Sequence, residues 1–225
     1  MAAAGGPVRP RWEVPPPQWL VEFIGSAKTF IYLSIMEPYR EFRLDPKGGF
    51  FGVNMAIYRD LLFEVGGFNP EAVGDVWIGD GETGLNRKLW EQGLLIGYVP
   101  DAIVYHHIPA HRMTVEYLCR RMANEGACTE YTRFHKGIPG PIGMWMWIIR
   151  LSLSLVKLGA TSLRRIILKR DRFAVLRARM AFAYQLSRIR YVIRLLHDPA
   201  LRELVVQEYW LTKLSCTCLL TSFPW

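Results

Sequence analysis

The sequence is poor in cysteine and lacks the cysteine spacing of a metal or redox site. Its 225 residues include four cysteines, Cys119, Cys128, Cys216 and Cys218. The first pair lies inside one expected helix, and a single residue separates the second pair, whereas zinc and redox motifs place two residues between their cysteines. We therefore expect reduced thiols, as is usual in the cytosol.

The first 17 residues lack the apolar stretch that a secretory signal peptide needs. They are rich in Ala, Gly and Pro instead. We expect them to form a loop.

Acidic residues are nearly absent from one long stretch of the chain. The net charge is +8, but Arg150 to Arg194 holds 12 Lys or Arg and one acid, Asp171, which leaves about −3 for the remainder. A basic segment joined to a nearly neutral domain favours an anionic partner, either a lipid surface or a nucleic acid.

Turn residues and apolar runs predict an α/β part followed by a helical part. Lys136–Pro141 is rich in Gly and Pro, and we place the boundary there, between residues 1–135 and a helical tail over residues 136–225. Thr114 is the expected N-cap of a helix that reaches His135. Other helices are expected over Gln18–Leu33, Arg59–Val65 and Glu82–Gln92, and strands over Phe50–Val53, Leu94–Val99 and Ala102–His106.

Short motifs follow one another in a fixed order through the α/β part. They are Gly52-Val53-Asn54-Met55-Ala56, Val65-Gly66-Gly67-Phe68, Gly79-Asp80-Gly81-Glu82-Thr83, Tyr98-Val99-Pro100-Asp101-Ala102, Val104-Tyr105-His106-His107 and Arg112-Met113-Thr114. Each motif is weak alone, but their order and spacing over about residues 8–135 resemble the second half of the family-two glycosyltransferases with the GT-A fold.

The resemblance implies an α/β fold class: a partial GT-A-like half-domain, the acceptor side, followed by an α-helical, basic, membrane-associated tail. It also implies an inverting transfer, which needs a carboxylate to take the proton from the acceptor hydroxyl. The family places this acid in a Glu-Asp pair at the start of a helix. Here its Asp falls on Glu82 and its Glu on Gly81, so Glu82 is the first choice for the base and Asp80 the second. The alternative is that both acids only cap the helix.

Other site residues follow from the same resemblance. His106 matches a position that assists the metal-diphosphate, as an accessory ligand, or it simply packs. Arg112 is expected to neutralise the diphosphate. Asn54 and Trp77 are candidates for the acceptor, although Trp77 is equally consistent with a core residue.

The family's metal-binding D-x-D motif occurs nowhere in this sequence. We therefore expect the nucleotide-binding half to precede Met1, and a divalent metal, Mn or Mg, to be a cofactor of the complete enzyme only. Whether the isolated chain is active stays open.

The tail contains a candidate membrane helix over residues 142–168. Arg150, Ser154, Lys157, Thr161, Arg164 and Arg165 recur at helical spacing among aliphatic residues, with Trp145 and Trp147 at the start. This pattern favours a helix lying in a membrane interface. A helix packed on the domain and a helix that spans the bilayer are the alternatives.

Two functions remain at this point. The first is a hexosyltransferase fragment of cell-envelope polysaccharide synthesis, which moves a sugar from a nucleotide-sugar donor to a lipid-linked or polysaccharide acceptor at the cytoplasmic face of the membrane. The second is a non-enzymatic basic helical protein that binds anionic membrane or nucleic acid. Because no nucleic-acid motif is present, we expect no nucleic-acid partner.

Overall fold

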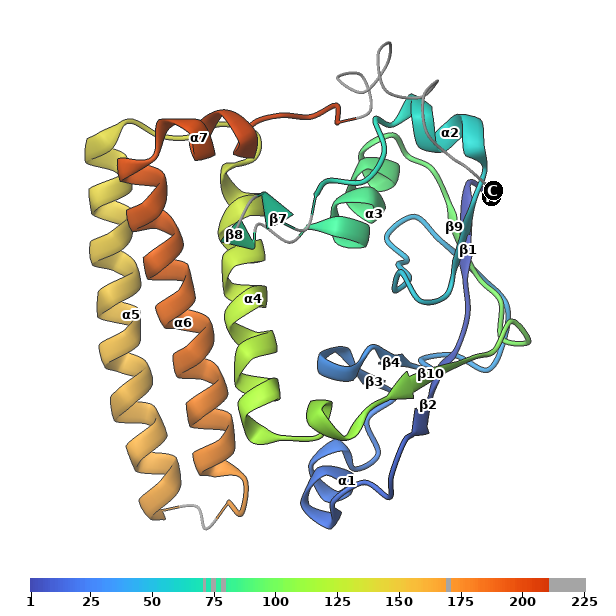
Figure 1. Cartoon of the computed structure of the whole chain (residues 1–225), viewed down its shortest axis with the longest axis horizontal. Helices are drawn as coiled ribbons and strands as arrows, with labels where there is room; N and C mark the ends of the chain where they lie inside the picture. Colours follow the sequence, from blue (N-terminus) through green and yellow to red (C-terminus); the bar gives the residue numbers. More distant parts are fainter. Residues whose placement is uncertain (71, 74–75, 78–79, 169–170, 211–225) are drawn as a thin grey trace, which may run out of the picture.

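The computed structural model describes residues 1–70, 72–73, 76–77, 80–168 and 171–210. The fold is a mixed α/β arrangement, with two small sheets on one side of a layer of long helices (Figure 1). The predicted α/β content is thus confirmed at the level of fold class.

The first sheet has the strand order β5-β9-β1-β6. Its strands are β5 (Arg43–Asp45), β9 (Ile96–Tyr98), β1 (Ala3–Gly5) and β6 (Met55–Ile57). β1 pairs in parallel with β9 and antiparallel with β6. Two helices, α2 (Arg59–Glu64) and α3 (Gly81–Glu91), contribute apolar side chains to a core shared with this sheet.

The second sheet has the order β10-β2-β4-β3. Its strands are β10 (Val104–Ile108), β2 (Val8–Trp12), β4 (Ile35–Met36) and β3 (Thr29–Phe30). Next to it lie α1 (Gln18–Ile24) and two short 3-10 turns, η1 (Ile31–Leu33) and η2 (Ala110–Arg112). A third pairing joins β7 (Ala72–Val73) and β8 (Val76–Trp77).

The prediction of a loop over residues 1–17 is wrong, because this segment supplies an inner strand of each sheet, β1 and β2. Its small residues are needed there. A Cβ on Gly6 would lie 2.3 Å from the carbonyl oxygen of Ala102, and one on Gly5 would lie 2.5 Å from Cβ of Phe50. The composition that indicated a loop reflects this close approach of neighbouring segments instead.

Two other predicted elements differ from the structure. The helix expected over Gln18–Leu33 ends at Ile24, where Gly25 takes a φ of 55° and stops it. The strand expected over Phe50–Val53 is a turn, and the strand begins at Met55. Phe50 is apolar because it is buried in the core beneath this turn.

The helices expected near Arg59, Glu82 and Thr114 are confirmed. α4 (Val115–Phe134) begins at Thr114, whose hydroxyl accepts a hydrogen bond from the backbone N–H of Tyr117. The tail is helical as expected and forms α5 (Pro141–Leu168), α6 (Ala174–His197) and α7 (Pro199–Val205).

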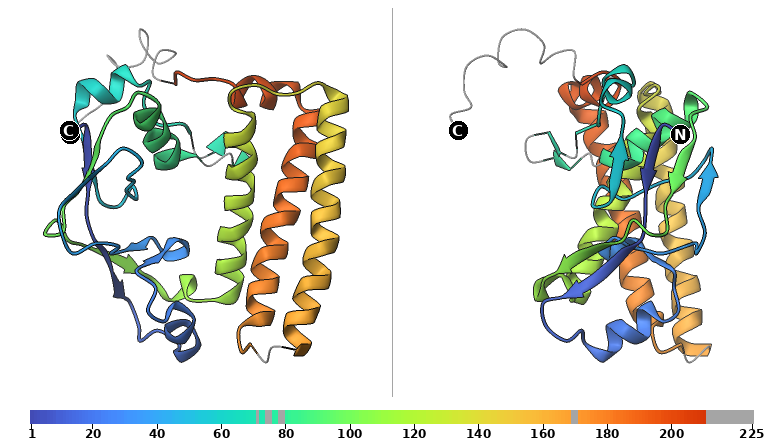
Figure 2. Two further views of the ribbon diagram at one scale, coloured as in Figure 1. Left: turned by 180° about the vertical axis from the view of Figure 1, so that it is seen from behind. Right: turned by 90° about the vertical axis from the view of Figure 1, so that its right-hand side faces the viewer.

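The long helices form one layer in which α6 lies between α4 and α5 (Figures 1 and 2). The helix predicted to close the α/β part therefore packs directly on the tail. In this layer α5 is the outermost helix, on the side away from the sheets. Its segment Pro141–Ile167 is long and apolar enough to cross a membrane by length and composition, and only 17% of its apolar 18-residue window is buried.

A buried carboxylate joins the three helices. Glu130 of α4 is fully buried and forms an ion pair with Arg188 of α6, with an Nε–Oε1 distance of 2.6 Å. Its other oxygen accepts a hydrogen bond of 2.8 Å from the indole N–H of Trp147 in α5. The apolar side chains around it, among them Tyr131, Ile148 and Val192, form the largest core cluster.

We predict that Glu130→Gln strongly destabilises the fold. Removing one partner of a buried ion pair leaves the other charge uncompensated, which typically costs about 3–5 kcal/mol. Urea denaturation followed by circular dichroism measures the loss in the free energy of unfolding.

Glu116→Gln is the matched control, because Glu116 pairs with Arg179 of α6 on the surface, where its side chain is 75% exposed. An exposed pair contributes at most about 1 kcal/mol. Equal losses for the two variants would contradict the role given to Glu130.

Candidate functional site

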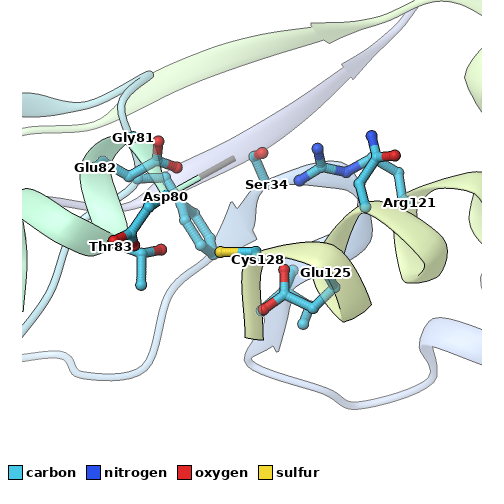
Figure 3. A pocket seen from close by; sticks show the side chains of 11 residues that line it. Ser34, Asp80, Gly81, Glu82, Thr83, Arg121, Glu125 and Cys128 are labelled. Carbon is cyan, nitrogen blue, oxygen red and sulfur yellow. The ribbon is translucent and has the colours of Figure 1, made fainter. Parts of the chain in front are cut away.

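A pocket lies between the start of α3 and the middle of α4. Figure 3 shows side chains of the two helices facing one another across it. The residues that line it are Ile31, Ser34, Phe51, Asp80, Gly81, Glu82, Thr83, Arg121, Asn124, Glu125 and Cys128. The lining is mostly polar, and both predicted catalytic acids belong to it.

Asp80 is buried and already has partners. Its Oδ2 accepts hydrogen bonds from Arg87 at 2.9 Å and from the side-chain amide of Asn69 at 3.1 Å. Gly84 leaves room for this cluster, since a Cβ there would lie 2.8 Å from Asp80 Oδ2. Asp80 makes no side-chain capping bond to the backbone of α3. It therefore anchors the start of α3 through its ion pair.

Glu82 has the opposite environment. It is half-buried, lies one residue into α3, and within the described part of the chain its carboxylate has no hydrogen-bond or ion-pair partner. Gly52 lies beside it, and a Cβ there would be 3.6 Å from Glu82 Oε2. Of the two acids, Glu82 is the one whose carboxylate is free to accept a proton in the pocket.

One face of α4 supplies the opposite wall. Arg121, Asn124, Glu125 and Cys128 follow the i, i+3, i+4, i+7 spacing that places side chains on one side of a helix. Sequence reasoning missed this wall, although the spacing was present as a signal. Burial raises the pKa of the Cys128 thiol, so this side chain is no nucleophile.

Ser34, at the end of η1, also lines the pocket. Ser34 is the one non-glycine residue with a positive φ, 54°, in the described part of the chain. Such a conformation costs free energy and persists where the surroundings impose it, often at functional sites. The local strain thus lies in the same pocket as Glu82.

Glu125 brings a third carboxyl to the pocket, after Asp80 and Glu82. The residue is exposed, but its pKa is raised above the ordinary 4.5, first by partial desolvation and then by the negative charges of Glu82 and Asp80, while Arg121 opposes the shift. Because Asp80 is paired with Arg87, two further acids, Glu82 and Glu125, remain in the pocket against one arginine, Arg121, which leaves a net negative charge.

This shift predicts a pH dependence of stability. At pH values between 4.5 and the raised pKa of Glu125, the folded chain holds a proton that the unfolded chain has released. Stability supplied by this proton is present below 4.5 and is lost as the pH rises through the pKa of the folded state. Glu125→Gln cannot titrate and should remove this loss.

The measurement is the free energy of unfolding from about pH 4 to about pH 8, for the wild type and Glu125→Gln. Glu41→Gln, which removes an exposed carboxyl outside the pocket, is the control. A difference between wild type and Glu125→Gln that stays constant with pH would contradict a raised pKa for Glu125 in the folded state.

The predicted diphosphate residues lie together, but not among the residues of this pocket. Arg112 Nη1 is 3.4 Å from His106 Nε2, and its guanidinium lies over the ring of Tyr117. Desolvation and the neighbouring Arg112 lower the pKa of His106. The imidazole is therefore neutral near pH 7, beside a cation.

Of the two residues predicted to contact the acceptor, the structure describes the side chain of Asn54 and only the backbone of Trp77. Asn54 donates from its side-chain amide to the backbone carbonyls of Pro7 at 3.0 Å and Ala102 at 2.7 Å, so it joins two loops. The backbone of Trp77 belongs to β8, and its side chain lies outside the described part of the chain. Acceptor contact by either residue stays a prediction.

The described residues do not fit a resident metal. Among them no group of three or more His, Cys, Asp or Glu side chains is placed to hold an ion. The carboxylate of Asp80 is already paired with Arg87. We derive no chemical step through Mn or Mg, and the metal stays a prediction for the complete enzyme.

Comparisons with protein-family models, with curated proteins and with solved structures find no match to this chain. Function must therefore be argued from the pocket itself.

Proposed function

We propose that this chain supplies the acceptor side and the general base of a nucleotide-sugar glycosyltransferase. The observation that carries the proposal is the free carboxylate of Glu82 in a pocket of hydrogen-bonding side chains. The order of the sequence motifs agrees with this function, since the acidic turn that resembles the family's base motif is the segment that lines the pocket.

The proposed reaction requires the protein to position the acceptor hydroxyl and to supply a carboxylate base. A hydroxyl of the acceptor sugar donates a hydrogen bond to Glu82, which takes the proton as the oxygen attacks the anomeric carbon. The bond from that carbon to the nucleoside diphosphate breaks in the same step, and the diphosphate carries away the electron pair. Asp80 acts on this reaction indirectly, by fixing the start of α3 through Arg87.

The rest of the pocket suits a sugar acceptor. Ser34, Thr83 and Asn124 offer hydrogen-bond donors and acceptors, and Phe51 offers an apolar surface. The acidic balance favours a neutral or amino sugar over an anionic one. The acceptor is accordingly a glycan, either free or linked to a lipid.

We predict that Glu82→Gln abolishes transfer while leaving acceptor binding nearly unchanged, because the amide keeps the shape and loses the basicity. Removal of a general base typically lowers the rate by roughly 100-fold to 10,000-fold. The assay measures release of nucleoside diphosphate from a panel of nucleotide sugars, in a chain that also carries a donor-binding half.

Glu64→Gln, on an exposed turn of α2, is the control and should transfer at the wild-type rate. Asp80→Asn should act mainly through stability. If Asp80→Asn remains folded and loses transfer while Glu82→Gln keeps it, the base has been assigned to the wrong acid.

A further inference from the structure

Helix α5 is apolar on two opposite faces, only one of which is covered. Met144, Ile148 and Leu151 are buried against α6. On the opposite side seven large apolar residues repeat at steps of three, four or seven: Ile142, Met146, Ile149, Leu153, Val156, Leu163 and Ile167. Their exposed fractions run from 57% for Ile149 to 78% for Ile142.

Helix α6 widens this uncovered surface. Val175, Phe182, Leu186 and Ile193 are also exposed and repeat along one side of the helix. The Phe182 ring lies at the border of the two helices, since its Cζ is 3.7 Å from where a Cβ of Gly159 would be. We call these residues of α5 and α6 together the outer face.

Cations border the outer face along its length. Arg150, Lys157 and Arg164 are exposed, seven residues apart, and each follows an outer-face residue of α5 in the sequence. Within the described part of the chain none of the three has an ion-pair partner, although the Arg150 guanidinium lies over the ring of Trp147. No Asp or Glu occurs in α5 or α6.

We propose that the outer face rests on an anionic lipid bilayer, with α5 and α6 lying parallel to its plane. Lipid tails cover the apolar side chains, and lipid phosphates pair with the bordering cations. A nucleic acid would satisfy the cations and leave the aliphatic residues in water. A second copy of this chain would cover the aliphatic residues. It would, however, place its own cations next to Arg150, Lys157 and Arg164, and neither α5 nor α6 has an acid to pair with them.

The cations of α5 and the packing of α6 on it argue against a helix that spans the bilayer. Arg150 and Lys157 lie in the middle part of α5, where a charge is disfavoured in a bilayer. α6 packs along α5 and would have to enter the membrane with it, although it carries five arginines. A helix that lies in the interface keeps all of these cations at the lipid surface.

The first measurement is sedimentation of the purified chain with vesicles. Vesicles of phosphatidylcholine and phosphatidylserine should bind the chain, and vesicles of phosphatidylcholine alone should bind it at least roughly tenfold more weakly. Binding to the anionic vesicles should weaken at high salt without vanishing, because salt screens the cations and leaves the apolar contribution. Equal binding to both vesicle types, or to neither, would overturn the proposal.

The second measurement replaces Arg150, Lys157 and Arg164 together by Gln. Affinity for anionic vesicles should fall by roughly 100-fold, since each of the three cations contributes on the order of a fivefold factor near an anionic surface. A spanning helix predicts the opposite sign, because removing charges from the bilayer interior would strengthen its insertion. Replacing the exposed Lys28, Arg40 and Lys47 by Gln is the charge-matched control and should leave affinity unchanged.

The third measurement separates lipid from the other partners. Ile149→Gln with Val156→Gln should reduce the salt-resistant part of binding, whereas the control pair Val14→Gln with Phe42→Gln, at exposed sites outside the helical layer, should not. Circular dichroism checks that each variant is folded. Complete competition by duplex DNA, or a dimer in sedimentation velocity that the Ile149/Val156 variant loses, would contradict the assignment to lipid.

Discussion

The buried carboxylate of Glu130 is the contact on which the rest of the arrangement depends. It joins α4 to Arg188 of α6 and to Trp147 of α5, so that three helices share one charge network. A buried acid is costly unless it is fully paired, which makes the packing of these helices specific as well as tight. Because α4 is held from this side, its other face can present Arg121, Asn124 and Glu125 at a fixed position opposite α3.

The packing of the three helices also separates the pocket from the outer face. The pocket is lined by α4 together with the start of α3, whereas α6 and α5, which carry the outer face, lie on the other side of α4 (Figure 1). Packed helices are about 8–10 Å apart, so at least one helix-packing distance separates the pocket from the outer face.

The sequence predicted those parts whose signals are local. The N-cap at Thr114 and the helix that begins near Glu82 depend on capping and turn residues, and the structure shows both. The strands β1 and β2 could not be predicted in the same way, because Gly5 and Gly6 are required by close contact with segments that are distant in the sequence. The α4 wall had the spacing of a helical face, but only tertiary packing shows that this face meets Glu82. The distinction between Asp80 and Glu82 likewise depends on Arg87 and Asn69, which lie at other positions in the sequence.

The central claim is that the pocket between α3 and α4 binds a sugar acceptor next to Glu82. The most direct test is an NMR titration of the nitrogen-15-labelled chain with a panel of short neutral oligosaccharides. We predict saturable shifts of the backbone amide signals of Glu82, Thr83, Asn124 and Glu125, which line the pocket from both helices. Absence of any shift over the panel, or shifts confined to residues outside this pocket, would contradict the claim.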